Sequence, residues 1–131
     1  MKRGWNLELS FDKVWKDLLE LASSKESIST LSQHVSNDIK PFSSKSIIVV
    51  SERTLIRRFL RKERFRLFWS VLKQKGSLVR ENIPASKRMY VGRIIFSILA
   101  HLPYVEYELK PQRLYLMQNS SHPLGTLKKR S

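Results

Sequence analysis

Five arginines lie within twelve residues in the middle of the chain, spaced so that a helix would carry their guanidinium groups on one side. They are Arg53, Arg57, Arg58, Arg61 and Arg64. Guanidinium groups pair bidentately with phosphate oxygens and with the edge of guanine. Glu52 and Glu63 are the nearby acids, so pairing within the helix would neutralise only a minority of the arginines. The pattern favours a phosphate track over a solvated helix face.

Catalytic and metal chemistry have little support in the sequence. The histidines, His34, His101 and His122, lie in three separate segments, the four glycines are scattered, and cysteine is absent. The pattern therefore contains no metal-ligand motif, no glycine-rich phosphate loop and no cysteine nucleophile. We expect a protein that is not an enzyme and that has no metal, no cofactor and no small-molecule substrate.

The charge of the chain is strongly basic and unevenly distributed. Lys and Arg number 25 against 11 acidic residues among 131, a net charge of +14. Residues 1–50 hold seven basic and six acidic residues, whereas residues 51–131 hold eighteen and five. A solubilising surface usually mixes both signs, so the excess in the second part predicts a surface for a polyanion such as nucleic acid.

No segment has the length or hydropathy of a membrane span. The first ten residues, MKRGWNLELS, lack the apolar run of a signal peptide, and the run Ile94–Ala100 is far shorter than the roughly 20 residues that cross a bilayer. We expect no membrane association and an intracellular location, in the cytoplasm, the nucleoid or a nucleus.

The N-terminal third predicts two helices and one ambiguous run. Ser10 is placed to cap a helix over residues 11–23, and a shorter helix follows over residues 27–39, ended by Pro41. Residues 40–46 read as a loop. The β-branched run Ile47–Val50 fits either a buried strand or the lead-in to the next helix.

The arginine cluster falls on a predicted helix over residues 52–62, capped by Ser51. Leu55, Ile56, Phe59 and Leu60 form its apolar stripe. Helical spacing continues over residues 63–75 with a stripe on a different side, which predicts either a break near residue 63 or one long helix that packs against two cores. Gly76 then ends the helix.

The segment after Ser86 predicts a helix and a hairpin. Residues 87–102 carry apolar side chains at helical spacing, and residues 105–117 alternate around a turn at residues 110–113. Pairing of Leu109 with Leu114 would place Tyr107 opposite Leu116.

A helix with a basic outer face, followed closely by a hairpin with a basic tip, resembles the end of a winged helix-turn-helix domain. The resemblance covers roughly residues 63–118. The order of helices and the Ser51 cap also resemble a first helix-turn-helix, although the connection over residues 40–50 is long for that motif. The implied fold is a winged helix-turn-helix, which is mostly α with a small β-hairpin. The resemblance of the first half extends this to two such units in tandem. The implied organisation is an N-terminal unit over 1–62, a winged unit over 63–118 and a basic flexible tail over 119–131.

The resemblance also implies a function and a set of DNA contacts. A helix of this family enters the major groove and the wing touches the backbone, which implies double-stranded DNA as partner, a sequence-specific transcriptional regulator and a homodimer. Arg93 would contact bases, and the wing would contact the backbone. The remaining implied contacts are the five central arginines with Lys87, Arg88, Tyr90, Lys110 and Arg113. Two alternatives stay open: a non-specific architectural or DNA-coating protein, and a protein-interaction module of a larger nucleic-acid machine.

Overall fold

The computed structural model describes residues 9–25, 27–31, 36–83, 92–110 and 112–130 and shows an α+β fold. In chain order the elements are α1 (Phe11–Ser24), β1 (Ser27–Ser29), β2 (Ser36–Ser43), β3 (Ser46–Ser51), β4 (Arg57–Arg61), α2 (Lys62–Lys75), β5 (Ser77–Val79), the short 3₁₀ helix η1 (Arg80–Asn82), α4 (Gly92–Ala100), β6 (Val105–Leu109) and β7 (Gln112–Leu116). Seven strands among the described residues overturn the predicted mostly α fold with a single hairpin.

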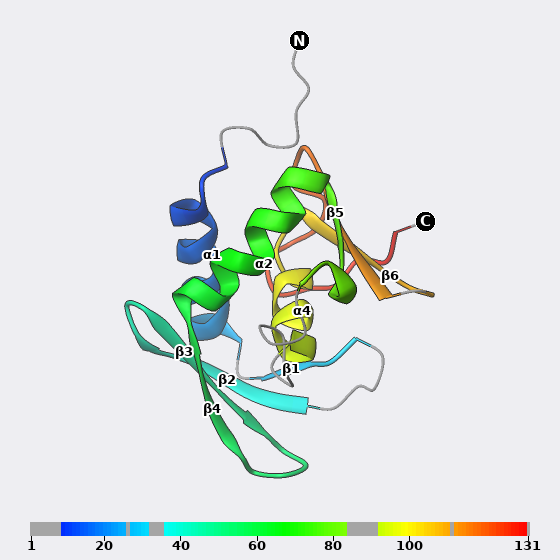
Figure 1. The fold of residues 1–131 in the computed structure, drawn as a ribbon. Coiled ribbons are helices and arrows are strands. Elements are labelled where there is room, and N and C mark those ends of the chain that lie inside the picture. The colour runs from blue at the N-terminus through cyan, green and yellow to red at the C-terminus, as the bar shows by residue number, and fades with distance from the viewer. Residues whose placement is uncertain (1–8, 26, 32–35, 84–91, 111, 131) are drawn as a thin grey trace.

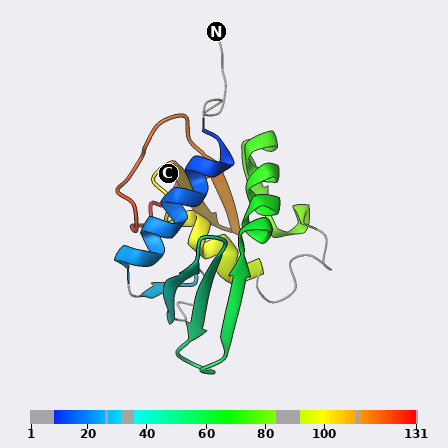
Figure 2. The same cartoon turned by 90° about the vertical axis from the view of Figure 1, so that its left-hand side faces the viewer.

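The strands form two antiparallel sheets. One contains four strands in the order β1-β2-β3-β4, and the other contains three in the order β5-β7-β6. In Figure 1 the four-stranded sheet lies at the bottom of the molecule and the three-stranded sheet at the upper right, with α4 between them. The β3–β4 turn projects away from the helices in Figures 1 and 2.

The first helix is confirmed, including its start. The Ser10 side chain accepts a hydrogen bond from the Lys13 backbone N–H, which satisfies one of the free donors of the first turn. The Trp15 indole N–H donates to the carbonyl of Ser44 at 2.8 Å. This bond fastens the helix to the turn between β2 and β3.

The predicted helix over residues 27–39 is wrong, because this segment contributes to β1 and β2. Leu31, Val35 and Ile39 follow one another at intervals of four residues in the sequence, which fits both a helical stripe and one face of a strand. The pairing of β2 with β1 ends at Asp38, and Pro41 lies beyond that point in β2. Because proline has no N–H group, its position there removes no hydrogen bond to β1. The run Ile47–Val50 is a strand, one of its two open interpretations.

The predicted basic helix over residues 52–62 is also wrong. The Ser51 hydroxyl accepts hydrogen bonds from the N–H groups of Arg53 and Thr54, so it does begin a turn. Leu55 then adopts φ of 61°, a left-handed conformation that stops helix propagation. The chain reverses into β4, which satisfies the free edge of β3.

The predicted break near residue 63 is present, although a strand and not a helix precedes it. A strand gives way to α2 between Arg61 and Lys62, close to the predicted break at residue 63. The helix ends at Gly76, whose φ of 80° is the left-handed conformation expected of a C-terminal glycine.

The helix and hairpin of the C-terminal part are present, with two corrections. All described residues of α4 except Arg93 are buried, so this part of the helix lacks the basic outer face that the resemblance implies. Ser97 accepts a hydrogen bond from the Leu31 N–H in the core. In the hairpin, Leu114 pairs with Tyr107 and not with Leu109, a shift of two residues that keeps the same faces.

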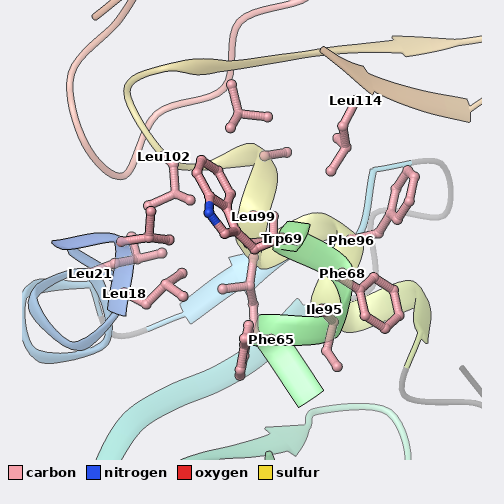
Figure 3. Packing of buried hydrophobic residues seen from close by; sticks show 14 of the residues in the cluster. Leu18, Leu21, Phe65, Phe68, Trp69, Ile95, Phe96, Leu99, Leu102 and Leu114 are labelled. Carbon is pink, nitrogen blue, oxygen red and sulfur yellow. The ribbon is translucent and has the colours of Figure 1, made fainter. Parts of the chain in front are cut away.

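One hydrophobic core joins residues on both sides of the proposed domain boundary at residue 62. Figure 3 shows Leu18 of α1, Phe65 and Trp69 of α2 and Leu99 of α4 packed towards one another. The last segment, expected to be a flexible tail, is held against β6: the Tyr107 N–H donates to the carbonyl of Lys128, and the N–H of Arg130 donates to that of Tyr107.

Candidate nucleic-acid interface

The strand β4 presents basic side chains on both faces of the four-stranded sheet. Successive side chains of a strand point to opposite faces. Leu60 is buried in the core, and Arg58 shares that face. Arg57, Phe59 and Arg61 point the other way and are exposed. We call this second face the outer face of the sheet. Since β4 forms one edge of the sheet, its arginines can be reached from the side as well.

Three of the predicted arginines meet in one hollow of about 190 Å³ at the end of the sheet. Arg53 comes from the β3–β4 turn, Arg58 from β4 and Arg93 from α4. We call this the arginine hollow. It is also lined by polar side chains from four positions, Thr30, Asn37, Ser51 and Thr54. The lining therefore offers hydroxyl and amide groups beside the guanidinium groups.

The charge of the arginine hollow is one-sided. None of the described residues that line it is acidic. Arginine side chains that line one hollow favour an anion there, because guanidinium groups form charge-assisted hydrogen bonds with phosphate oxygens. The arrangement can hold a phosphate group by charge-assisted hydrogen bonds, with no chemistry performed on it.

Arg61 and Arg64 gather at a second hollow where β4 passes into α2. Phe59 and Glu63 also line it, so one acidic side chain is present there. Arg57 stands on the outer face two residues before Phe59. The five central arginines thus occupy a strand, its turn and the next helix, and not one side of a single helix.

The predicted wing contacts lie away from the arginine hollow. The three-stranded sheet that contains the β6–β7 hairpin is at the far end of the molecule in Figures 1 and 2. Lys110 is exposed near the hairpin tip, whereas Arg113 is half-buried and donates to the hydroxyl of Ser77 at 3.3 Å. This bond links β7 to β5, the strand on which Ser77 lies.

Three of the predicted DNA contacts, Lys87, Arg88 and Tyr90, lie outside the described residues. Arg93 is half-buried in the first turn of the described part of α4, and it reaches the arginine hollow instead of an exposed helix face. Because the rest of this part of α4 is buried, its residues cannot lie in a major groove.

Sequence reasoning missed the aromatic residues that the outer face presents. Phe42 and Phe59 are 61% and 52% exposed, and their ring centroids are 4.9 Å apart. The helical interpretation places Phe59 in an apolar stripe. The segment Arg57–Arg61, RRFLR, shows no alternation of apolar and polar residues, so the sequence carries no local signal that it forms a strand.

Comparisons of the chain with protein-family models, with curated proteins and with solved structures find no match. Among the described residues, no cluster of histidine and acidic side chains could hold a metal ion. None of the described helices is long and apolar enough to cross a membrane.

Proposed function

We propose that this protein binds nucleic acid and that its affinity comes chiefly from phosphate contacts. The observation that carries the proposal is the convergence of Arg53, Arg58 and Arg93 in one hollow, from three elements and across forty residues of sequence. Basic side chains that only keep a protein soluble have no reason to converge. A phosphate of a polynucleotide matches the positive charge of such a site, and arginine can donate two parallel hydrogen bonds to phosphate oxygens.

The arginines of β4 would extend the contact beyond the hollow. Arg57 and Arg61 are exposed on the same edge strand whose other face supplies Arg58. Charged residues on an edge strand also discourage aggregation between sheets. That role explains Arg57 and Arg61, but it does not explain why Arg58 meets Arg53 and Arg93 on the core side. The combined surface suits a polymer of phosphates better than a single small anion.

Double-stranded DNA, the partner implied by the resemblance, remains the first target to test. Sequence-specific regulation needs contacts to base edges as well as to phosphates. The burial of the described part of α4 favours phosphate-directed binding over a recognition helix in the major groove. A nucleic-acid target would also place the protein inside a cell.

The test is binding of a fluorescently labelled mixed-sequence duplex at several salt concentrations. We expect the logarithm of the association constant to fall linearly with the logarithm of salt concentration. The variant R53A/R58A/R93A should bind more weakly, and its slope should be shallower by about 0.9 for each phosphate that the variant no longer neutralises. Thermal unfolding checks that the variant is folded.

A matched control removes the same charge elsewhere. Lys16, Lys75 and Lys129 are exposed and line none of the described hollows. The variant K16A/K75A/K129A should retain most of the affinity. Equal weakening by both triple variants would show that net charge alone drives binding and would overturn the hollow as the site. A wild-type protein that binds no nucleic acid at low salt would overturn the function itself.

A further inference from the structure

Two phenylalanines meet on the outer face of the four-stranded sheet although their strands are not neighbours. Phe42 lies in β2 and Phe59 in β4, with β3 between them. Their rings contact edge to face, at an interplanar angle of 70°. Contact across an intervening strand requires both side chains to rise on the same face and lean over it.

The outer face is identified by the residues on its opposite side. Ile39, Val49 and Leu60 belong to the hydrophobic core, so their side of the sheet faces the helices. Ile48 pairs with Phe59 and with Lys40 and lies outside that core cluster. It is nevertheless only 6% exposed, and with Lys40 it lines a hollow beside Ala22 at the end of α1. Phe59 therefore has a buried apolar neighbour, Ile48, beside it in the sheet.

Basic side chains frame the rings. Arg57 and Arg61 flank Phe59 on β4, four residues apart, which in a strand is about 13 Å. Lys40 pairs with Ile48 and projects from the same face of β2. Asp38 also projects from this face. Among the described strand residues, the outer face therefore carries three basic side chains and one acidic side chain.

Exposed aromatic rings between guanidinium groups match a single-stranded polynucleotide in two ways. Each unpaired base has a π-face that stacks on an aromatic ring, and each phosphate pairs with a cation beside it. A duplex matches only the second feature, because its base faces are already stacked on one another. An apolar protein partner would match the rings but would gain little from the three cations around them.

We propose that the outer face of the four-stranded sheet binds unpaired nucleotides, with bases stacked on Phe59 and Phe42 and the backbone held by Arg57 and Arg61. This inference rests on the proposed nucleic-acid binding and names the form of the nucleic acid. Phosphate contacts in the arginine hollow serve both duplex and single strand, whereas stacking serves the single strand alone.

The experiment compares aromatic and aliphatic side chains at position 59. Phe59→Leu keeps an apolar side chain but removes the π-face, and Phe59→Trp enlarges the π-face. The probes are a labelled 20-nucleotide single strand, as DNA and as RNA, and the duplex of the same sequence. We expect Phe59→Leu to weaken single-strand binding about five- to hundredfold and to leave duplex binding unchanged. Phe59→Trp should bind the single strand at least as tightly as the wild type.

Two controls separate stacking from loss of apolar surface and from misfolding. The first control is Leu127→Ala, which removes apolar surface at an exposed residue outside the sheet and should bind both probes like the wild type. Since Phe59 is half exposed, both of its variants should unfold at nearly the wild-type temperature. The DNA and RNA arms show which sugar the surface prefers.

The outcomes distinguish this inference from the function on which it rests. If Phe59→Leu binds single strand and duplex as the wild type does, the stacking surface is refuted while the arginine hollow stands. That is also the result expected of a surface for a protein partner. If Phe59→Leu weakens the binding of single strand and duplex equally, the ring contributes to binding without stacking on unpaired bases, and the inference fails. If no probe binds the wild type, both proposals fail.

Discussion

The hydroxyl of Tyr104 donates a hydrogen bond of 2.7 Å to the carboxylate of Asp17, and both side chains are buried. Asp17 lies in α1 and Tyr104 lies just before β6, so the bond joins the N-terminal helix to the C-terminal sheet across 87 residues. Lys13 donates to the other carboxylate oxygen at 2.9 Å. Burial and the bond to Asp17 raise the pKa of Tyr104 far above its ordinary value, so Tyr104 remains a donor.

Tyr104→Phe should destabilise the protein, because a buried carboxylate loses one of its donors. A hydrogen bond to a charged group contributes about 1.5 to 3 kcal/mol, and we expect a loss of that size in the free energy of unfolding by urea. Tyr115→Phe is the matched control, since the Tyr115 hydroxyl donates to Glu108 at 2.9 Å nearer the surface. We expect that control to lose less than about 1 kcal/mol. Equal losses would contradict the effect of burial.

Leu55→Gly should stabilise the protein. Leu55 has φ of 61° and a side chain that is 76% exposed, so it carries backbone strain without apolar burial to offset it. Removing the Cβ relieves about 1 kcal/mol of backbone strain in the native state. The greater conformational entropy of glycine in the unfolded chain offsets part of this gain. Leu55→Ala keeps the Cβ and should give no comparable gain. Urea unfolding of the two variants compares them directly, and a more stable alanine variant would count against the strain.

His101 should make the protein less stable as the pH falls below neutrality. Burial is the main cause that lowers the pKa of His101 from 6.5. The hydrogen bond that its ring N–H donates to the Ser97 carbonyl opposes this shift, and the charges of Lys25 and His122 lower the pKa further. The unfolded chain therefore binds a proton near pH 6.5 while the native state does not. Stability is unaffected above that pH and declines below it, until the lower native pKa is reached.

The measurement is the free energy of unfolding from pH 8 to pH 5 for the wild type and for His101→Gln. The slope that one histidine contributes is at most about 1.4 kcal/mol per pH unit. The difference between the two proteins should therefore shrink as the pH falls from 7 to 5. A constant difference over that range would refute the role of His101.

Removing residues 119–131 should destabilise the fold. The segment is hydrogen-bonded to Tyr107 through Lys128 and Arg130, and the Gly125 N–H donates to the carbonyl of His101. Bonds of this kind contribute about 1 kcal/mol each, so we expect a loss of about 2 to 4 kcal/mol on thermal or urea unfolding. Lys129→Ala, which leaves those backbone bonds in place, should change stability by less than about 0.5 kcal/mol. A truncated chain as stable as the wild type would restore the expectation of a free tail.

Local signals predict the elements whose ends are marked by capping residues. Ser10 marks the start of α1 and Gly76 the end of α2, and both predictions are confirmed. Between residues 27 and 61 the same apolar spacing fits a helix and a strand, and Ser51 starts a turn in either case. There the backbone pairing of β3 with β4, between residues 7 to 15 positions apart, decides the structure.

The candidate site is predictable as a set of residues but not as a place. Sequence reasoning selects Arg53, Arg58 and Arg93 for their chemistry, yet it puts them on two separate helices. Their meeting in the arginine hollow depends on the sheet and on the burial of α4. The Phe42–Phe59 contact likewise needs β3 between its two strands, which no local spacing shows.

The salt dependence of duplex binding by R53A/R58A/R93A, beside the K16A/K75A/K129A control, tests the central claim most directly. Phosphate binding in the arginine hollow predicts weaker binding and a slope shallower by about one to three units for the first variant alone. Indistinguishable affinities and slopes for the two variants would contradict it.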